Sequence, residues 1–164
     1  MLGADARLLQ QGAYGDWSST GVFESALTRE ELWAVLSQEQ SWTEWWEELE
    51  AVRLRGPLEP GTRGTMRLRG LPPLRVTVRA ASAPSLLALQ VVTGPLLAEF
   101  EFALHELPGG GTEIRERVSI VGPAARMVGR FFDLRRGPNF GLSMTRLVSL
   151  AVVASHAGPA LRGR

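Results

Sequence analysis

The chain has 164 residues, and its 18 Lys and Arg residues against 17 Asp and Glu residues give a net charge of +1. This length is typical of one domain with a sizeable core, and the balanced charge argues against a nucleic-acid partner. The absence of cysteine excludes disulfides, thiolate catalysis, thiolate zinc sites and iron–sulfur clusters. Because only His105 and His156 are present, we also expect no metal site and no cofactor.

No apolar run approaches the roughly 20 residues of a membrane span. The N-terminus lacks the basic region and apolar run of a secretory signal. We therefore expect a cytoplasmic protein, a monomer or a homodimer, without stable membrane insertion. Residues 1–20 are predicted to form a flexible arm, residues 21–156 a single domain, and residues 157–164 a tail.

The first predicted elements are a strand over residues 22–27 and two short helices. Thr28, with Glu31 three residues later, has the pattern of a helix capping box. The second helix is expected around Trp42, Trp45 and Trp46. These tryptophans either plug the core and cover the sheet edge, or one indole lines a cavity entrance and stacks on a flat ligand.

From residue 51 the apolar pattern changes from a helical period to a period of two. Apolar residues alternate mostly with charged ones in residues 52–55, 66–69, 74–80, 99–105 and 113–120, and Leu87, Leu89 and Val91 show the same period of two. Short turns rich in Gly and Pro separate these segments, which predicts an antiparallel sheet of about seven strands. Its charged face, with arginines on some strands and glutamates on others, is predicted to be solvated.

The segment after residue 123 is predicted to be helical and to cover the apolar face of the sheet. Residues 124–136 place Met127, Phe131 and Leu134 on one side of a first helix. Gly137 and Pro138 are predicted to break or kink it. A long helix then runs to about residue 155, with an apolar stripe at spacings of 4, 3, 4 and 3 formed by Phe140, Met144, Leu147, Ala151 and Ala154.

Several sequence segments match one known fold family. They are Trp33, the Trp42–Trp45–Trp46 group, residues 56–64 (GPLEPGTRG), residues 104–106 (LHE), residues 110–114 (GGTEI) and residues 122–125 (GPAA). With this order of elements, the chain over roughly residues 21–155 resembles the START-like (SRPBCC) superfamily, in its polyketide cyclase/dehydrase and lipid-transport branch.

The resemblance implies an α+β helix-grip fold. In this fold a curved antiparallel sheet of about seven strands wraps around a long C-terminal helix, and two short helices follow the first strand. The family uses one cavity between helix and sheet for lipid or hormone carriage, polyketide ring closure and ligand-dependent signalling. We carry over the cavity and no catalytic residue, because fold alone does not settle function.

Glu116 is the weak catalytic candidate, because strand parity places it on the inward face with Ile114 and Val118. In one interpretation Glu116 is solvated, because the strand end is open to water or because a bulge shifts the alternation. In the other it is a polar group inside an apolar cavity. In the second case it orients a ligand hydroxyl or acts as an acid or base, with a raised pKa unless an arginine compensates. Its candidate neighbours are Asn139, Ser143 and a Trp indole.

Other charged candidates have simpler interpretations. His105 has the parity of the outer face and is expected to be exposed rather than catalytic. Asp133 and Arg135 are expected to form a solvated helix face or cap, unless the kink brings them to the cavity mouth.

The ligand cavity is predicted to be lined by aromatic, aliphatic and methionine side chains together with Glu116. The predicted lining is Trp42, Trp46, Met66, Leu68, Val76, Leu89, Phe100, Phe102, Glu116, Val118, Met127, Phe131, Phe140, Met144 and Leu147. The leading hypothesis is binding of a lipid-, polyketide- or aromatic-like small molecule. The alternative is a polyketide cyclase, aromatase or dehydratase using the same cavity, so catalysis stays open. A third class, a protein-binding regulatory module, requires an exposed apolar patch instead.

Overall fold

The computed structural model describes residues 7–10 and 16–157. The rest of the predicted arm and of the predicted tail, residues 1–6, 11–15 and 158–164, lies outside the described residues. The elements are, in chain order, β1 (Arg7–Gln10), β2 (Trp17–Ser25), α1 (Arg29–Leu36), the 3₁₀ helix η1 (Glu39–Ser41), α2 (Trp42–Trp45), β3 (Leu49–Leu54), β4 (Arg63–Leu68), β5 (Leu74–Ser82), β6 (Leu86–Thr93), β7 (Leu96–Glu106), β8 (Thr112–Val121) and α3 (Ala125–Ala157).

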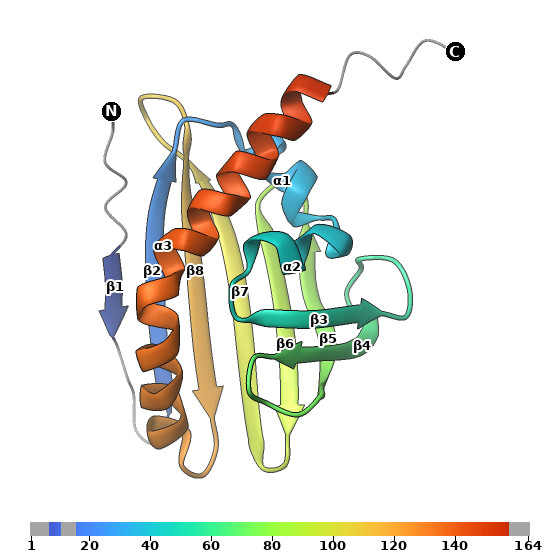
Figure 1. Ribbon diagram of the computed structural model, residues 1–164, viewed down its shortest axis with the longest axis vertical. Coiled ribbons are helices and arrows are strands. Elements are labelled where there is room, and N and C mark those ends of the chain that lie inside the picture. The colour runs from blue at the N-terminus through green and yellow to red at the C-terminus, as the bar shows by residue number, and fades with distance from the viewer. Residues whose placement is uncertain (1–6, 11–15, 158–164) are drawn as a thin grey trace.

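The strands form one antiparallel sheet in the order β1-β2-β8-β7-β6-β5-β4-β3. It curves around α3, while α1 and α2 lie on one side of that helix (Figure 1). The predicted helix-grip architecture is confirmed, with β2 to β8 as the seven expected strands and β1 as a further edge strand. The first strand was predicted too short: β2 begins at Trp17, where it pairs with Ile120 of β8, so the folded part starts before residue 21.

The predicted capping box at the start of α1 is present. The backbone N–H of Glu31 donates to Thr28 Oγ1 over 3.3 Å. In return, the backbone N–H of Thr28 donates to Glu31 Oε2 over 2.8 Å. These two bonds satisfy donors that a helix start otherwise leaves unpaired, so the chain turns sharply from β2 into α1.

The two predicted C-terminal helices form one continuous helix, α3, which includes Pro138. Of the two predicted alternatives, the break is wrong, whereas a kink agrees with the change of direction of the α3 ribbon (Figure 1). Proline removes one helical N–H and crowds the preceding turn. Burial on both sides of Pro138, at Gly129 and Arg136 before it and Phe140 and Met144 after it, favours a continuous helix. By length and apolar composition alone, α3 also meets the criteria for a membrane span, so a cytoplasmic location stays a prediction.

The first part of α3 is rotated relative to the prediction. Met127, Phe131 and Leu134 are 69 %, 54 % and 78 % exposed, so this side does not face the sheet. At Gly129 the helix approaches β2 so closely that a Cβ would collide with the Trp17 ring. This contact sets the helix rotation and turns the positions next to Gly129, not the predicted side, toward the sheet.

Three tryptophans pack in the interior beneath the sheet. Trp45 and Trp46 stack with ring centroids 5.9 Å apart, and Trp46 packs edge-on against Phe100 and Phe102, each at 5.2 Å. The Nε1–H of Trp42 donates to the Leu36 carbonyl over 2.8 Å. All three tryptophans are at most 2 % exposed, which matches their interpretation as core residues.

Candidate functional site

A buried ion pair joins α3 to the sheet. Arg136 Nη2 lies 3.4 Å from Glu116 Oε2, and these side chains are 1 % and 4 % exposed. Arg136 also donates to Ser19 Oγ over 3.1 Å and to the Glu116 carbonyl over 3.3 Å. Glu116 therefore points inward, as strand parity predicts, and its charge is compensated by an arginine that the sequence interpretation did not place there.

Glu48 is a second buried carboxyl, in the turn between α2 and β3. It is 9 % exposed, and among the described residues its Oε1 has no hydrogen-bond partner. Burial raises the pKa of Glu48 from 4.5 to about 7, and the negative charge of Glu116 adds to the rise while Arg136 opposes it. A carboxyl with this pKa exchanges a proton near neutral pH.

Glu48 lines a cavity of about 350 Å³ between the first half of α3, the α2–β3 turn and the β4–β5 turn. Its walls are mainly apolar, with Glu48 and a few other polar groups among them. The lining residues are Glu47, Glu48, Leu68, Arg69, Gly70, Leu71, Val128, Phe131, Phe132, Arg135 and Asn139. This volume falls at the lower end of the range for small-molecule sites, roughly 300–1,000 Å³.

Two arginines stand in the cavity wall on opposite elements. Arg135 Nη1 donates to the Arg69 carbonyl over 2.9 Å, and Arg69 Nε donates to the Glu47 carbonyl over 2.7 Å. Gly70 has a positive φ of 76°, and a Cβ there would meet Arg135 Nη1 at 2.8 Å. Glycine at this turn therefore leaves room for the guanidinium that ties α3 to the β4–β5 turn.

The side chains predicted to line a ligand cavity divide between this cavity and the buried core cluster. Leu68 and Phe131 line the cavity, whereas Met127 is exposed and is not part of its wall. The remaining predicted hydrophobic side chains are at most 2 % exposed and do not line this cavity; they are Trp42, Trp46, Met66, Val76, Leu89, Phe100, Phe102, Val118, Phe140, Met144 and Leu147. Glu116 does not line it either.

The remaining polar candidates have separate positions. Asn139 lines the cavity, and Arg135 also lines it, as the alternative interpretation allowed. Ser143 is buried and accepts a hydrogen bond from the Glu47 N–H over 3.0 Å. Over the described ranges, no group of three or more His, Asp or Glu side chains is placed to hold a metal ion.

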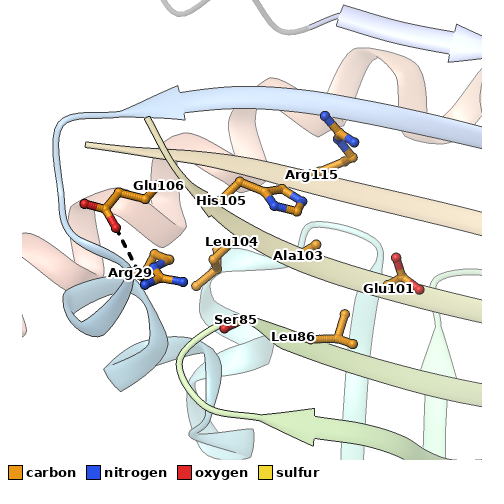
Figure 2. A pocket seen from close by; sticks show the side chains of 9 residues that line it. All are labelled: Arg29, Ser85, Leu86, Glu101, Ala103, Leu104, His105, Glu106 and Arg115. Carbon is orange, nitrogen blue, oxygen red and sulfur yellow. Dashed lines mark ion pairs between the residues drawn. The ribbon is translucent and has the colours of Figure 1, made fainter. Parts of the chain in front are cut away.

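His105 lies in a different, open hollow of about 580 Å³ on the outer face of the sheet. Figure 2 shows its side chain on β7 near Arg115 of β8, with the Arg29–Glu106 ion pair at one end of the hollow. That pair spans 3.7 Å, and its side chains are 31 % and 73 % exposed, so it contributes roughly 0–1 kcal/mol. The cavity beside Glu48 is the more apolar of the two and therefore the stronger candidate for binding a hydrophobic molecule.

Glu48 and Arg136 are the site residues that the sequence interpretation missed. Arg136 lies four residues after Phe132 and four before Phe140, a helical spacing that places all three on one face. Extending the apolar stripe that begins at Phe140 by one helical turn toward the N-terminus would have identified Arg136 as an inward-facing residue. Glu48 carries no such signal, because the chain turns between α2 and β3 and neither period applies there.

Comparisons with known proteins identify the family and agree with the fold. A family model described as polyketide cyclase/dehydrase and lipid transport matches residues 16–149. The chain belongs to this family. A comparison with curated proteins found no match.

Solved structures similar to this family member share its fold at low sequence identity. The di-domain ARO/CYC BexL from the BE-7585A biosynthetic pathway superposes with a TM-score of 0.62 and 18 % identity, covering 84 % of this chain. This chain spans 50 % of the BexL chain. Ara h 8.0201 superposes with a TM-score of 0.59 and 15 % identity, covering 82 % of this chain and 99 % of its own. Together the family and fold support hydrophobic ligand binding or cyclase activity in general terms.

Proposed function

We propose that the protein binds a hydrophobic small molecule, lipid-, polyketide- or aromatic-like, in the cavity between α3 and the β4–β5 turn. The observation that carries this proposal is a half-open, mainly apolar cavity of about 350 Å³ beside α3, with the buried Glu48 in its wall. Leu68, Val128 and Phe132 offer the apolar contacts, and burial of ligand surface against them contributes roughly 25 cal/mol per Å².

The proposal is tested by filling the cavity. Val128 is half-buried in its wall, so Val128→Trp is expected to occupy the space that a ligand needs. Val153 is 66 % exposed near the far end of the same helix, and Val153→Trp is the matched control. Binding of an uncharged naphthalene fluorophore is followed by fluorescence titration, and co-purified small molecules by mass spectrometry after denaturing extraction.

We expect Val128→Trp to lose probe binding and any co-purified molecule while Val153→Trp keeps both. Equal binding by the two variants, with both folded by circular dichroism, would place the ligand elsewhere. Absence of probe binding and of any co-purified molecule in the unmodified protein would refute the proposal.

The second candidate function is a polyketide cyclase, aromatase or dehydratase acting in the same cavity. The observation that favours it is Glu48, a buried carboxyl in the cavity wall with a pKa near neutrality. Such a group can accept and return a proton during enolisation or loss of water, and positioned acids and bases contribute roughly 10²–10⁴-fold. A β-hydroxyketone chain offered to the protein should then lose one water, seen as a mass decrease, and Val128→Trp should abolish that reaction.

A further inference from the structure

We propose that the protonated carboxyl of Glu48 is the polar contact for the ligand and donates a hydrogen bond to a carbonyl oxygen of an apolar ketone or ester. This inference rests on the proposed function, because it concerns the ligand of the same cavity. It specifies the chemical class of the ligand, an apolar molecule that carries a hydrogen-bond acceptor. It also implies that ligand affinity depends on pH.

The first support is geometric. Glu48 is 9 % exposed and lines the cavity. Its backbone is held in place, since the Glu48 carbonyl accepts a hydrogen bond from the Arg69 N–H over 2.9 Å. Its Oε1 nevertheless has no partner among the described residues. Buried polar atoms in folded proteins are nearly always hydrogen-bonded, so an unpaired carboxyl oxygen on a residue of the cavity wall points to a partner that the described chain does not supply, and we assign this partner to the ligand.

The second support comes from the charges around Glu48. Glu116 on β8 and Arg136 on α3 face it, and they pair with each other over 3.4 Å. Glu47 is its neighbour in the chain, and Glu47 in turn pairs with Arg146 of α3. Arg69 and Arg135 complete the charged groups of the cavity wall. No ion pair joins Glu48 to any of these arginines in the described part of the chain.

These surroundings favour the protonated form. Burial is the main cause that raises the pKa of Glu48 to about 7, and Glu116 adds to it. Near neutral pH a large fraction of the molecules therefore carries a carboxylic acid, which is a hydrogen-bond donor as well as an acceptor. An apolar ligand with a carbonyl satisfies that donor, whereas a hydrocarbon leaves it unpaired.

Two matched fluorescent probes test the inference. One is 6-propionyl-2-(dimethylamino)naphthalene, an aromatic ketone, and the other is 2-(dimethylamino)naphthalene, the same ring system without the carbonyl. Any apolar ring bound in the cavity buries Glu48 further and so makes binding depend on pH. Taking the ratio of the two affinities cancels this shared effect and leaves the contribution of the carbonyl. We expect this ratio, ketone over the parent amine, to fall about tenfold from pH 6 to pH 8.5 as the carboxyl ionises.

Glu48→Gln keeps the shape and an N–H donor but does not titrate. We expect its affinity ratio to be independent of pH and to exceed that of the unmodified protein at pH 8.5. Glu50→Gln is the control, because Glu50 is exposed on β3, pairs with Arg67 and does not line the cavity. Glu50→Gln should retain the pH dependence of the unmodified protein.

The possible failures are distinguishable. If both probes bind and Val128→Trp blocks them, but the ratio is flat with pH, the proposed function stands and the role of Glu48 is rejected. A pH-dependent ratio that persists in Glu48→Gln also rejects it. If neither probe binds the folded protein at any pH, the inference and its cavity are both overturned.

Discussion

Arg136 and Glu116 form an ion pair of 3.4 Å inside the domain, where their side chains are 1 % and 4 % exposed. Arg136 comes from the middle of α3 and Glu116 from β8, and the same guanidinium reaches Ser19 of β2. Charges so deeply buried require compensation. The pair thus anchors the helix over the junction of β2 and β8 and sets the electrostatic surroundings of Glu48.

Breaking this pair on one side should be costly. Arg136→Met leaves the Glu116 carboxylate buried without its cation, and we expect a loss of about 3–5 kcal/mol in unfolding free energy. Urea denaturation at pH 7 measures it. The double variant Arg136→Met with Glu116→Leu removes both charges and should recover much of the loss. If the losses in unfolding free energy of Arg136→Met and of Glu116→Leu alone add up to the loss of the double variant, the two side chains do not interact.

The same two residues should move the pKa of Glu48 in opposite directions. Glu116 raises it and Arg136 lowers it. Glu116→Gln should therefore lower the pKa of Glu48 below about 7, and Arg136→Met should raise it above that value. Titration of the Glu48 carboxyl carbon by NMR reads both shifts. Shifts of the same sign in the two variants would contradict this electrostatic arrangement.

Stability should depend on pH through Glu48. Because its folded pKa of about 7 lies above the unfolded value of 4.5, the folded state binds more protons between these values, and this contribution to stability falls as pH rises through that window. Ionising the buried group costs up to about 3 kcal/mol. Glu48→Gln should remove this component and be the more stable protein at pH 8. The test compares the urea midpoints of both proteins at pH 5 and pH 8. If the midpoint changes equally with pH in the two proteins, the prediction is wrong.

Met144 should behave as a solid core residue. It is fully buried on α3 and does not line the cavity. Met144→Ala is expected to lower the unfolding free energy by about 2–5 kcal/mol, because the packed interior cannot close the space. Val153→Ala, on the exposed side of the helix, should change it by no more than about 0.5 kcal/mol. Thermal and urea unfolding compare the two, and a small loss at Met144 would mean that the interior there is loosely packed.

Trp42 and Trp45 should respond differently to loss of the indole N–H. Trp42 Nε1 donates to the Leu36 carbonyl, whereas Trp45 Nε1 has no partner in the described structure. Both changes to Phe remove ring volume, so the comparison isolates the hydrogen bond. We expect Trp42→Phe to cost about 1–3 kcal/mol more than Trp45→Phe. Equal losses of unfolding free energy in the two variants would mean that ring packing alone, and not the hydrogen bond, determines the cost of each change.

The strands were predictable because their alternation has a strong physical cause. One face of the sheet packs on α3 and the other meets water, so apolar and charged residues alternate along β5, β7 and β8. Arg and Glu side chains also pair on the outer face, where Arg79 of β5 and Glu99 of β7 lie 3.6 Å apart. The capping box at Thr28 was also predictable, because it depends only on hydrogen bonds between residues that are close in the sequence.

The candidate site was harder to predict, because its parts meet only in three dimensions. Strand parity placed Glu116 inside, but its partner Arg136 lies 20 residues further along the chain. The rotation of the first part of α3 depends on the contact between Gly129 and Trp17, two residues in different elements. Glu48 lies in a turn, where no periodicity distinguishes an inward carboxyl from an outward one. Which part of the interior stays open is likewise a property of packing.

The pairing of β2 with β8 has a consequence for the order in which the protein is made. Trp17 of β2 pairs with Ile120 of β8, across roughly 100 residues of intervening sequence. At a synthesis rate of about 5–20 residues per second, β2 leaves the ribosome many seconds before the strand it pairs with. During that interval its central pairing edge is open and its apolar side lacks α3. Newborn chains therefore expose the β2 edge until β8 is made, and chains released before β8 cannot close the sheet.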